Sequence, residues 1–194
     1  MQKLSRETLY SLEEYAEARP TFRAEVLQHK KNRALAIGEH ATLYFEDFLT
    51  MKYQVQEMLR IEKIFEKAGI EEELDAYNPL VPDGCNWKAT FMIEYGDVEE
   101  RRKALETLVG IEDKTWMQVE GFDKVYAIAD EDLERTEADK TSAVHFMRFQ
   151  LTPEMTSAAK QGAAINGGID HDSYNISVSP IPANIRDSLS EDLD

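Results

Sequence analysis

The chain has 194 residues, a formal net charge of −16 and a single cysteine. It is long enough to bury a core without disulfides or a structural metal, and the lone Cys85 suits a reducing cytoplasm. Its negative charge argues against nucleic acid and anionic membranes as partners, and we find neither a signal-peptide pattern nor an apolar run long enough to span a bilayer.

The N-terminal part of the chain predicts two short helices followed by two strands. Ser11 and Glu14 have the spacing of a capping box for the first helix. Pro20 suits the first turn of the second helix, because proline is favoured where no backbone N–H is needed. The runs RALAI (33–37) and ATLYFED (41–47) then predict strands separated by a turn.

The strongest helical pattern runs from about Asp47 to Ala68. Apolar residues cover more than half of its helical wheel, and lysines, an arginine and a glutamine fill the rest. We therefore expect one long, largely buried central helix that packs against a sheet.

The second half of the chain predicts mainly strands. Residues 87–95 alternate apolar and polar side chains, as expected for a strand with one buried face. Further elements are predicted in chain order: a helix from Asp97 to Gly110, a hairpin over 115–130, a strand over 141–152 and a short helix starting at Pro153.

The predicted strands follow one another in pairs along the chain and do not alternate regularly with helices. This order favours an α+β fold over a doubly wound α/β fold. We expect residues 1–174 to form a single domain, with a mainly antiparallel sheet packed against the long central helix and short N-terminal helices. Residues 175–194 contain prolines and end in the acidic run SEDLD. They are expected to form an extended C-terminal segment with a mobile tail.

Five polar side chains are candidates for a binding site: Tyr53, Gln54, Glu57 and Arg60 on the long helix, and Arg148 on the strand over 141–152. Glu57 lies at the edge of the apolar arc and can pair with Arg60 one turn later. An unpaired buried carboxylate is costly, so Glu57 is either paired, protonated, metal-bound or exposed, and a structural hydrogen bond is the favoured interpretation. For Arg148 an internal ion pair is favoured over a ligand carboxylate.

His145 occupies the apolar face of the strand TSAVHFMRFQLT (141–152). A buried imidazole needs hydrogen-bond partners on its ring nitrogens, and a satisfied core histidine is the favoured interpretation. Catalysis by a hydroxyl group requires Thr141 or Ser142 near this ring, but Ser142 lies on the opposite face. We also expect Glu57 or Arg60 of the long helix to lie near His145 or Arg148.

A transition-metal site is a further alternative. His145, His171, Asp170 and Glu57 offer the imidazoles and carboxylates that iron, zinc or manganese accept. Asp170 and Asp172 flank His171 and favour either its protonated form or its orientation as a metal ligand. No local spacing links the four candidate ligands.

Several runs of the sequence resemble a bacterial family, domain of unknown function 3501. The most distinctive are YQVQEMLR (53–60) and KTSAVHF (140–146), and HKKNRALAIG (29–38) and ERRKALETLVGIEDKTWMQVEG (100–121) add to them. The resemblance extends to about Tyr174 and leaves out the last twenty residues. It supplies no catalytic residues.

The resemblance implies a cytoplasmic context beside rubrerythrin-like di-iron proteins and an iron–sulfur oxidoreductase subunit. It favours an accessory or binding protein that docks to such a redox partner in oxygen or peroxide defence. The alternative is a small metal-binding redox protein or metalloenzyme that uses His145, His171 and acidic residues. A third reading is a metal-free ligand pocket that includes Arg148, Tyr53 and Gln54. The sequence leaves open whether the protein is an enzyme.

Overall fold

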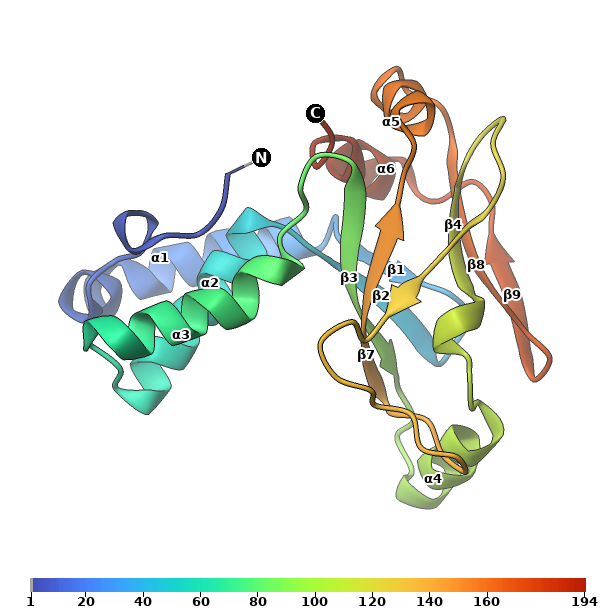
Figure 1. Cartoon of the computed structure of the whole chain (residues 1–194), viewed down its shortest axis with the longest axis horizontal. Coiled ribbons are helices and arrows are strands. Elements are labelled where there is room, and N and C mark those ends of the chain that lie inside the picture. The colour runs from blue at the N-terminus through green and yellow to red at the C-terminus, as the bar shows by residue number, and fades with distance from the viewer. Residues whose placement is uncertain (1) are drawn as a thin grey trace.

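The computed structural model describes residues 2–194 and confirms the α+β class. The strands of these residues form two antiparallel sheets (Figure 1). The first sheet has the order β1-β2-β3-β7-β6 and the second has the order β5-β4-β8-β9. The strands are β1 Ala34–Ala36, β2 Ala41–Glu46, β3 Asn86–Ile93, β4 Thr115–Val119, β5 Val125–Tyr126, β6 Ile128–Ala129, β7 Val144–Gln150, β8 Ile165–His171 and β9 Tyr174–Val178.

Three helices form an arm that projects from the two sheets (Figure 1). The arm consists of α1 Leu12–Lys30, α2 Phe48–Glu62 and α3 Lys67–Tyr77, and α2 contacts both of its neighbours. The remaining helices are the 3₁₀ turns η1 Arg6–Thr8, η2 Asn78–Leu80 and η3 Glu112–Lys114, and the α-helices α4 Val98–Thr107, α5 Pro153–Lys160 and α6 Ala183–Ser190. Among residues 2–194, none of the helices combines the length and the apolar character needed to cross a membrane.

The two short N-terminal helices predicted from the sequence are one continuous helix. The Ser11–Glu14 capping box is confirmed, but Pro20 lies inside α1 and does not start a new helix. The buried rings of Tyr15 and Phe22 stand on either side of Pro20 and pack edge to face. This packing holds α1 together across the backbone hydrogen bond that proline removes.

The long helix predicted over 47–68 ends earlier than its pattern suggests. Lys63 adopts a left-handed conformation with φ of 57° and closes α2, and a separate helix, α3, follows. Ile61 and Phe65 are 61% and 72% exposed. Only the first part of the predicted apolar face is therefore buried, and it packs against α1 and α3 within the arm.

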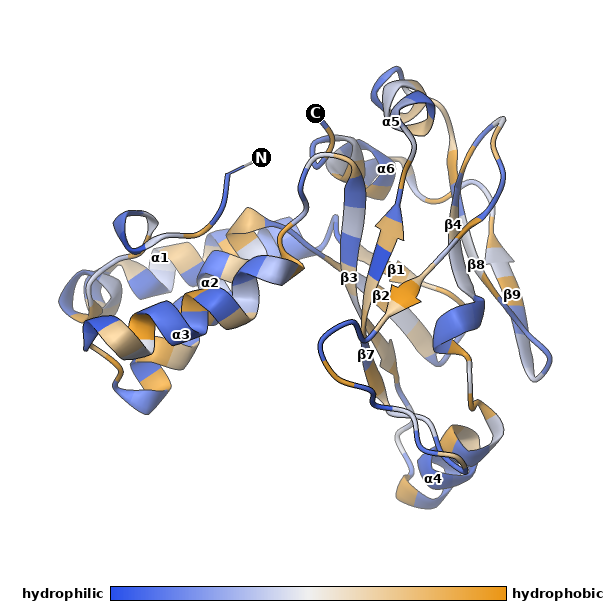
Figure 2. Ribbon diagram, in the orientation of Figure 1, coloured by the Kyte–Doolittle hydropathy of each residue, from blue (hydrophilic) through white to orange (hydrophobic). Residues whose placement is uncertain are grey.

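The inner face of the first sheet packs against the second sheet. Trp87 and Phe149 of the first sheet share one hydrophobic cluster with Met117 and Ile169 of the second. In Figure 2 the strands alternate between hydrophobic and hydrophilic residues along this layer. The chain passes from one sheet to the other at Ala127, between β5, which pairs with β4, and β6, which pairs with β7. The opposite face of the first sheet, which we call its outer face, lies on the side of the arm (Figure 1).

The C-terminal segment differs from the extended form predicted for 175–194. β9 forms an edge of the second sheet, and α6 then packs onto the body with Leu189 completely buried. The indole N–H of Trp87 donates to the carbonyl of Leu189 at 2.9 Å. Because its apolar side chains have a core to enter, this segment forms a helix despite its prolines.

A buried arginine between α1 and β1 joins the C-terminal segment to the first sheet. Arg33 is 2% exposed and donates to the carboxylate of Asp192 at 2.5 Å. It also donates to the backbone carbonyls of Phe45 and Glu46, and its Nη1 contacts Ser188. One guanidinium thus ties β2 to the segment after α6.

Candidate functional site

Strand β7 carries polar residues on its two opposite faces. His145 points into the core and is completely buried, whereas Arg148 lies on the outer face. The two side chains serve separate environments, because their hydrogen bonds go to different partners.

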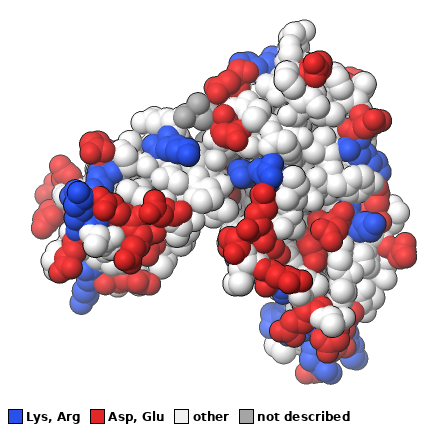
Figure 3. All heavy atoms as spheres, in the orientation of Figure 1, with Lys and Arg blue, Asp and Glu red and all other residues white. Residues whose placement is uncertain are grey.

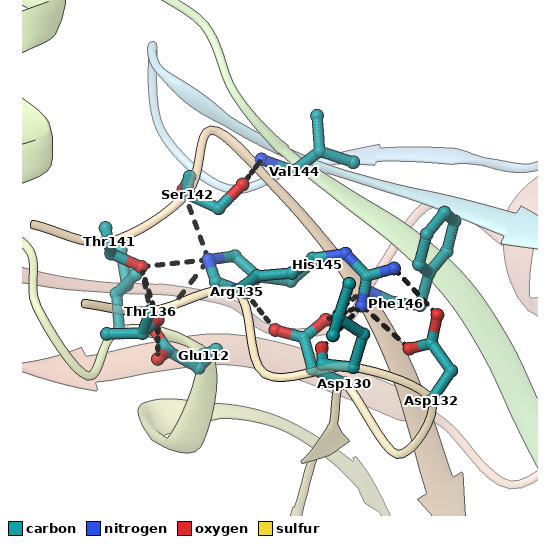
Figure 4. A network of polar contacts seen from close by, with 12 residues as sticks. Glu112, Asp130, Asp132, Arg135, Thr136, Thr141, Ser142, Val144, His145 and Phe146 are labelled. Carbon is teal, nitrogen blue, oxygen red and sulfur yellow. Dashed lines mark hydrogen bonds and ion pairs between the residues drawn. The ribbon is translucent and has the colours of Figure 1, made fainter.

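Both ring nitrogens of His145 have protein partners (Figure 4). Nδ1 lies 2.6 Å from the carboxylate of Asp130. Nε2 lies 2.9 Å from the hydroxyl of Thr141 and 3.1 Å from the carbonyl of Ser142. His145 is therefore a satisfied core histidine, held by residues just after β6 and just before β7 and not by the long helix.

The order Asp130–His145–Thr141 is that of a hydroxyl nucleophile with its base and orienting acid. Thr141 is completely buried, however, and its hydroxyl also contacts Glu112 and Thr136. A substrate carbonyl has no access to this oxygen in the present conformation. We therefore interpret the group as a structural network.

This network fixes both ends of the segment 130–140, which we call the acidic loop. Asp130 has a φ of 52°, a conformation that aspartate tolerates better than most residues, and its carboxylate accepts from the backbone of Phe146 at 3.0 Å. At the other end, Thr141 donates to the buried Glu112, and Thr136 in the middle of the loop donates to the same carboxylate. Arg135 bridges Asp130 and Asp132, as Figure 4 shows. The loop is thereby held over the outer face of the first sheet.

A cavity of about 290 Å³ lies between the acidic loop, the outer face of the first sheet and the end of the arm. Lys88 of β3 and Arg148 of β7 stand side by side in it as a cross-strand pair. We call it the Lys88 pocket. Its other lining residues include Tyr77, Leu80 and Phe146, which are apolar or aromatic, and Glu131 and Asp132 of the acidic loop.

The charges around the Lys88 pocket are paired with one exception. Arg148 forms a two-point ion pair with Glu131, at 2.8 and 2.6 Å, and lowers the pKa of that carboxyl. Asp132 is held by Arg135, which lowers its pKa to about 2. The ammonium of Lys88 makes no hydrogen bond or close ion pair with any residue from 2 to 194, and Glu131 and Asp83 attract it only at longer range. Burial, reinforced by the neighbouring Arg148, lowers the pKa of the Lys88 ammonium.

Arg148 is a candidate on the sequence alone, whereas Lys88 is not. The internal ion pair favoured for Arg148 is confirmed, with Glu131 as its partner. Lys88 occupies the polar face of an alternating strand, where a lysine normally points into water. Only the folded chain brings Tyr77 and Leu80 over that face. No local signal marks this lysine.

The candidates on α2 lie in the arm, away from His145. Glu57 accepts hydrogen bonds from Tyr15 and Arg19 of α1 and from Arg60. The predicted pairing of Glu57 with Arg60 is thus present, and Arg19 is the main cause that lowers the pKa of Glu57 to about 2. The structure shows no hydrogen bond or ion pair, among residues 2–194, between Glu57 or Arg60 and the polar residues of β7.

The other two α2 candidates also have structural surroundings. Tyr53 packs against Phe22, and Lys30 lies over its ring. Gln54 is half-buried, whereas the fully buried amide of α2 is Gln56, which accepts from the backbone of Tyr10 at 2.6 Å.

The four candidate metal ligands do not share a site. Asp170 accepts from Trp116, Lys124 and Tyr126. His171 accepts from the backbone of Ser173 and contacts the carbonyl of Val109, which together fit a neutral ring. With His145 and Glu57 in the networks above, the four occupy separate environments. Over residues 2–194, no group of three His, Cys, Asp or Glu side chains has an arrangement that could hold a metal ion.

The sequence matches, over residues 3–193, the family model described as "Protein of unknown function (DUF3501)". The chain belongs to this family. The match includes the C-terminal segment, so the expectation that the last twenty residues lie outside the family is wrong. A crystal structure of a novel protein of unknown function from Burkholderia pseudomallei is similar to this DUF3501 chain over the full length of both, with 52% identity and a TM-score of 0.94. No curated protein matches the chain.

Proposed function

We propose that this protein is a binding protein whose ligand occupies the Lys88 pocket. The observation that carries the proposal is the Lys88 ammonium, which lines a cavity of about 290 Å³ without an ion pair to any described residue. A half-buried ammonium whose N–H groups have no acceptor is unfavourable, and a ligand that accepts its hydrogen bonds removes that cost.

The lining of the pocket indicates the chemistry of the ligand. Tyr77, Leu80 and Phe146 offer an apolar and aromatic surface, and Lys88 offers hydrogen-bond donors. A matching ligand has a small apolar body with one acceptor group, a carboxylate or a carbonyl. The volume lies at the lower end of the range of about 300–1,000 Å³ typical of small-molecule sites, so the ligand is small.

A thermal-shift measurement tests this proposal with benzoate as the carboxylate probe and benzaldehyde as the carbonyl probe. Wild-type protein should be stabilised, by about 2.7 kcal/mol at a hundredfold excess over Kd. Lys88→Met should lose the stabilisation, whereas Lys103→Met, at an exposed position on α4, should keep it. A wild-type protein that neither probe stabilises, or a Lys88→Met variant that responds like wild type, would contradict the proposal.

A second candidate function is docking to a redox protein, as the sequence resemblance implies. Acidic side chains gather on the end of the arm and beside the hollow between the arm and the sheets (Figure 3), which favours a basic partner surface. Capture of a rubrerythrin-like or iron–sulfur protein at low salt, lost at high salt, would support this docking function; no capture at low salt would count against it.

The metal-binding alternative and the cytoplasmic location stay predictions. Elemental analysis of untagged protein tests the metal-binding alternative.

A further inference from the structure

We propose that Lys88 is a reactive amine whose Nζ forms a reversible imine with a neutral aldehyde or ketone bound in the Lys88 pocket. The inference rests on the proposed function, because it names the reacting group of that ligand.

The surroundings of Lys88 combine two features that make a lysine nucleophilic. Such an amine is desolvated by an apolar pocket or placed beside another cation, either of which favours the neutral form. Lys88 has both, since Phe146 and Leu80 line its pocket and Arg148 faces it across the strand pair. The lowered pKa of its ammonium agrees with this geometry.

Other lysines with close neighbours have their amines occupied. Lys124 donates to the carboxylate of Asp170 at 2.7 Å and lies over the ring of Trp116. Lys52 is partly buried, but its amine stands 4.4 Å from the ring centre of Tyr10 in a cation–π contact. Lys88 has no such contact within the described part of the chain, and its amine lines a cavity.

The charge of the protein favours a neutral carbonyl over an anion. With a net charge of −16, the molecule repels anions at long range, and Glu131 and Asp132 add negative charge at the pocket itself. An uncharged aldehyde or ketone enters without this repulsion. Once inside, it needs only a neutral amine and an apolar surface for its body.

The reaction balances without an oxidant or a reductant. The lone pair of Nζ forms a bond to the carbonyl carbon, and the carbonyl π pair moves to the oxygen, which takes up a proton. The nitrogen then loses a proton to solvent. Protonation of the hydroxyl lets it leave as water while the nitrogen lone pair forms the C=N bond, and loss of the remaining N–H proton to solvent gives the imine, so amine and carbonyl yield imine and water.

Reductive trapping of the wild-type protein tests the inference directly. Benzaldehyde and cyanoborohydride at pH 7 convert an imine into a stable secondary amine, which adds the mass of the aldehyde less one oxygen. Peptide mapping should place more label on Lys88 than on all other lysines together. Raising the pH to 9 should increase the label on exposed lysines such as Lys103 more than that on Lys88, because burial lowers the pKa of the Lys88 ammonium.

Lys88→Arg separates this inference from the proposed function. It keeps a cation in the pocket but cannot form an imine, so benzoate should still stabilise the variant while the main label disappears. If benzoate or benzaldehyde stabilises wild type and Lys88 is labelled no faster than Lys103, the imine is refuted and the binding proposal stands. If neither probe binds and Lys88 takes no label, both are refuted.

Discussion

Replacing His145 with alanine tests the conclusion that this residue is a structural anchor. The substitution removes a completely buried ring that touches Asp130, Thr141 and Ser142. It leaves the Asp130 carboxylate, whose side chain is only 9% exposed, without its closest partner.

The expected loss of stability follows from that burial. Removing the partner of a buried carboxylate costs about 3–5 kcal/mol, because the carboxylate stays desolvated. For a chain of this length each kcal/mol corresponds to about 2–4 °C, so the melting temperature should fall on the order of 10 °C. Asp130 keeps its bonds to Arg135 and Phe146, which places the loss at the lower end of this energy range.

Thermal unfolding followed by circular dichroism measures this effect. His40→Ala is the matched control, because His40 is only half-buried; its ring stacks on Tyr95 with the ring centroids 3.9 Å apart and its Nδ1 lies 3.0 Å from the carbonyl of Glu94, contacts worth about 0.5–1.5 kcal/mol each. A double-mutant cycle with Asp130→Asn should give a coupling energy of about 2 kcal/mol or more. Equal losses in the two alanine variants, or a coupling energy near zero, would refute the reasoning.

Two further predictions concern the arm and the C-terminus. The pKa of Glu57 is lowered from 4.5 to about 2, chiefly by Arg19, so its carboxylate stabilises the fold above pH 4.5 and this contribution is lost as the pH falls towards 2. Wild type should be more stable than Glu57→Gln at pH 5, by about 1–2 kcal/mol after allowance for the partial exposure of Arg19. Urea titrations should show this difference shrinking between pH 5 and pH 3, and an unchanged difference would contradict the prediction. Deleting residues 183–194 removes the buried Leu189, whose carbonyl accepts from the Trp87 indole. The truncated chain should therefore lose cooperative thermal unfolding. A melting temperature within a few degrees of wild type would show that α6 is dispensable.

The parts of the fold predicted well are those recorded in local burial patterns. β3 and β7 were located to within a few residues, because alternation of apolar side chains directly reports one buried face. The end of α2 at Lys63 was missed, since Ile64 and Phe65 continue the helical spacing of apolar residues beyond the turn. Pro20 was misread because tertiary packing of the neighbouring rings overrides a local preference.

The candidate site was only partly predictable for a related reason. His145 was recognised as unusual, since a titratable ring broke an apolar face. Its partner Asp130 lies fifteen positions earlier, in a charged run with nothing to mark it. Lys88 becomes distinctive only when the end of the arm covers one side of the sheet, and this depends on contacts between distant parts of the chain.

The buried Arg33 also constrains the order of events during synthesis. Its carboxylate partner, Asp192, lies 159 positions later. At translation rates of about 5–20 residues per second, roughly 8–32 seconds separate the two on the ribosome. During that interval Asp47, 3.3 Å from the Nε of Arg33, is the remaining carboxylate partner, and full burial of the guanidinium without Asp192 is unfavourable. We therefore expect the junction between α1 and β2 to close fully only after Asp192 has left the ribosome, late in the synthesis of this chain.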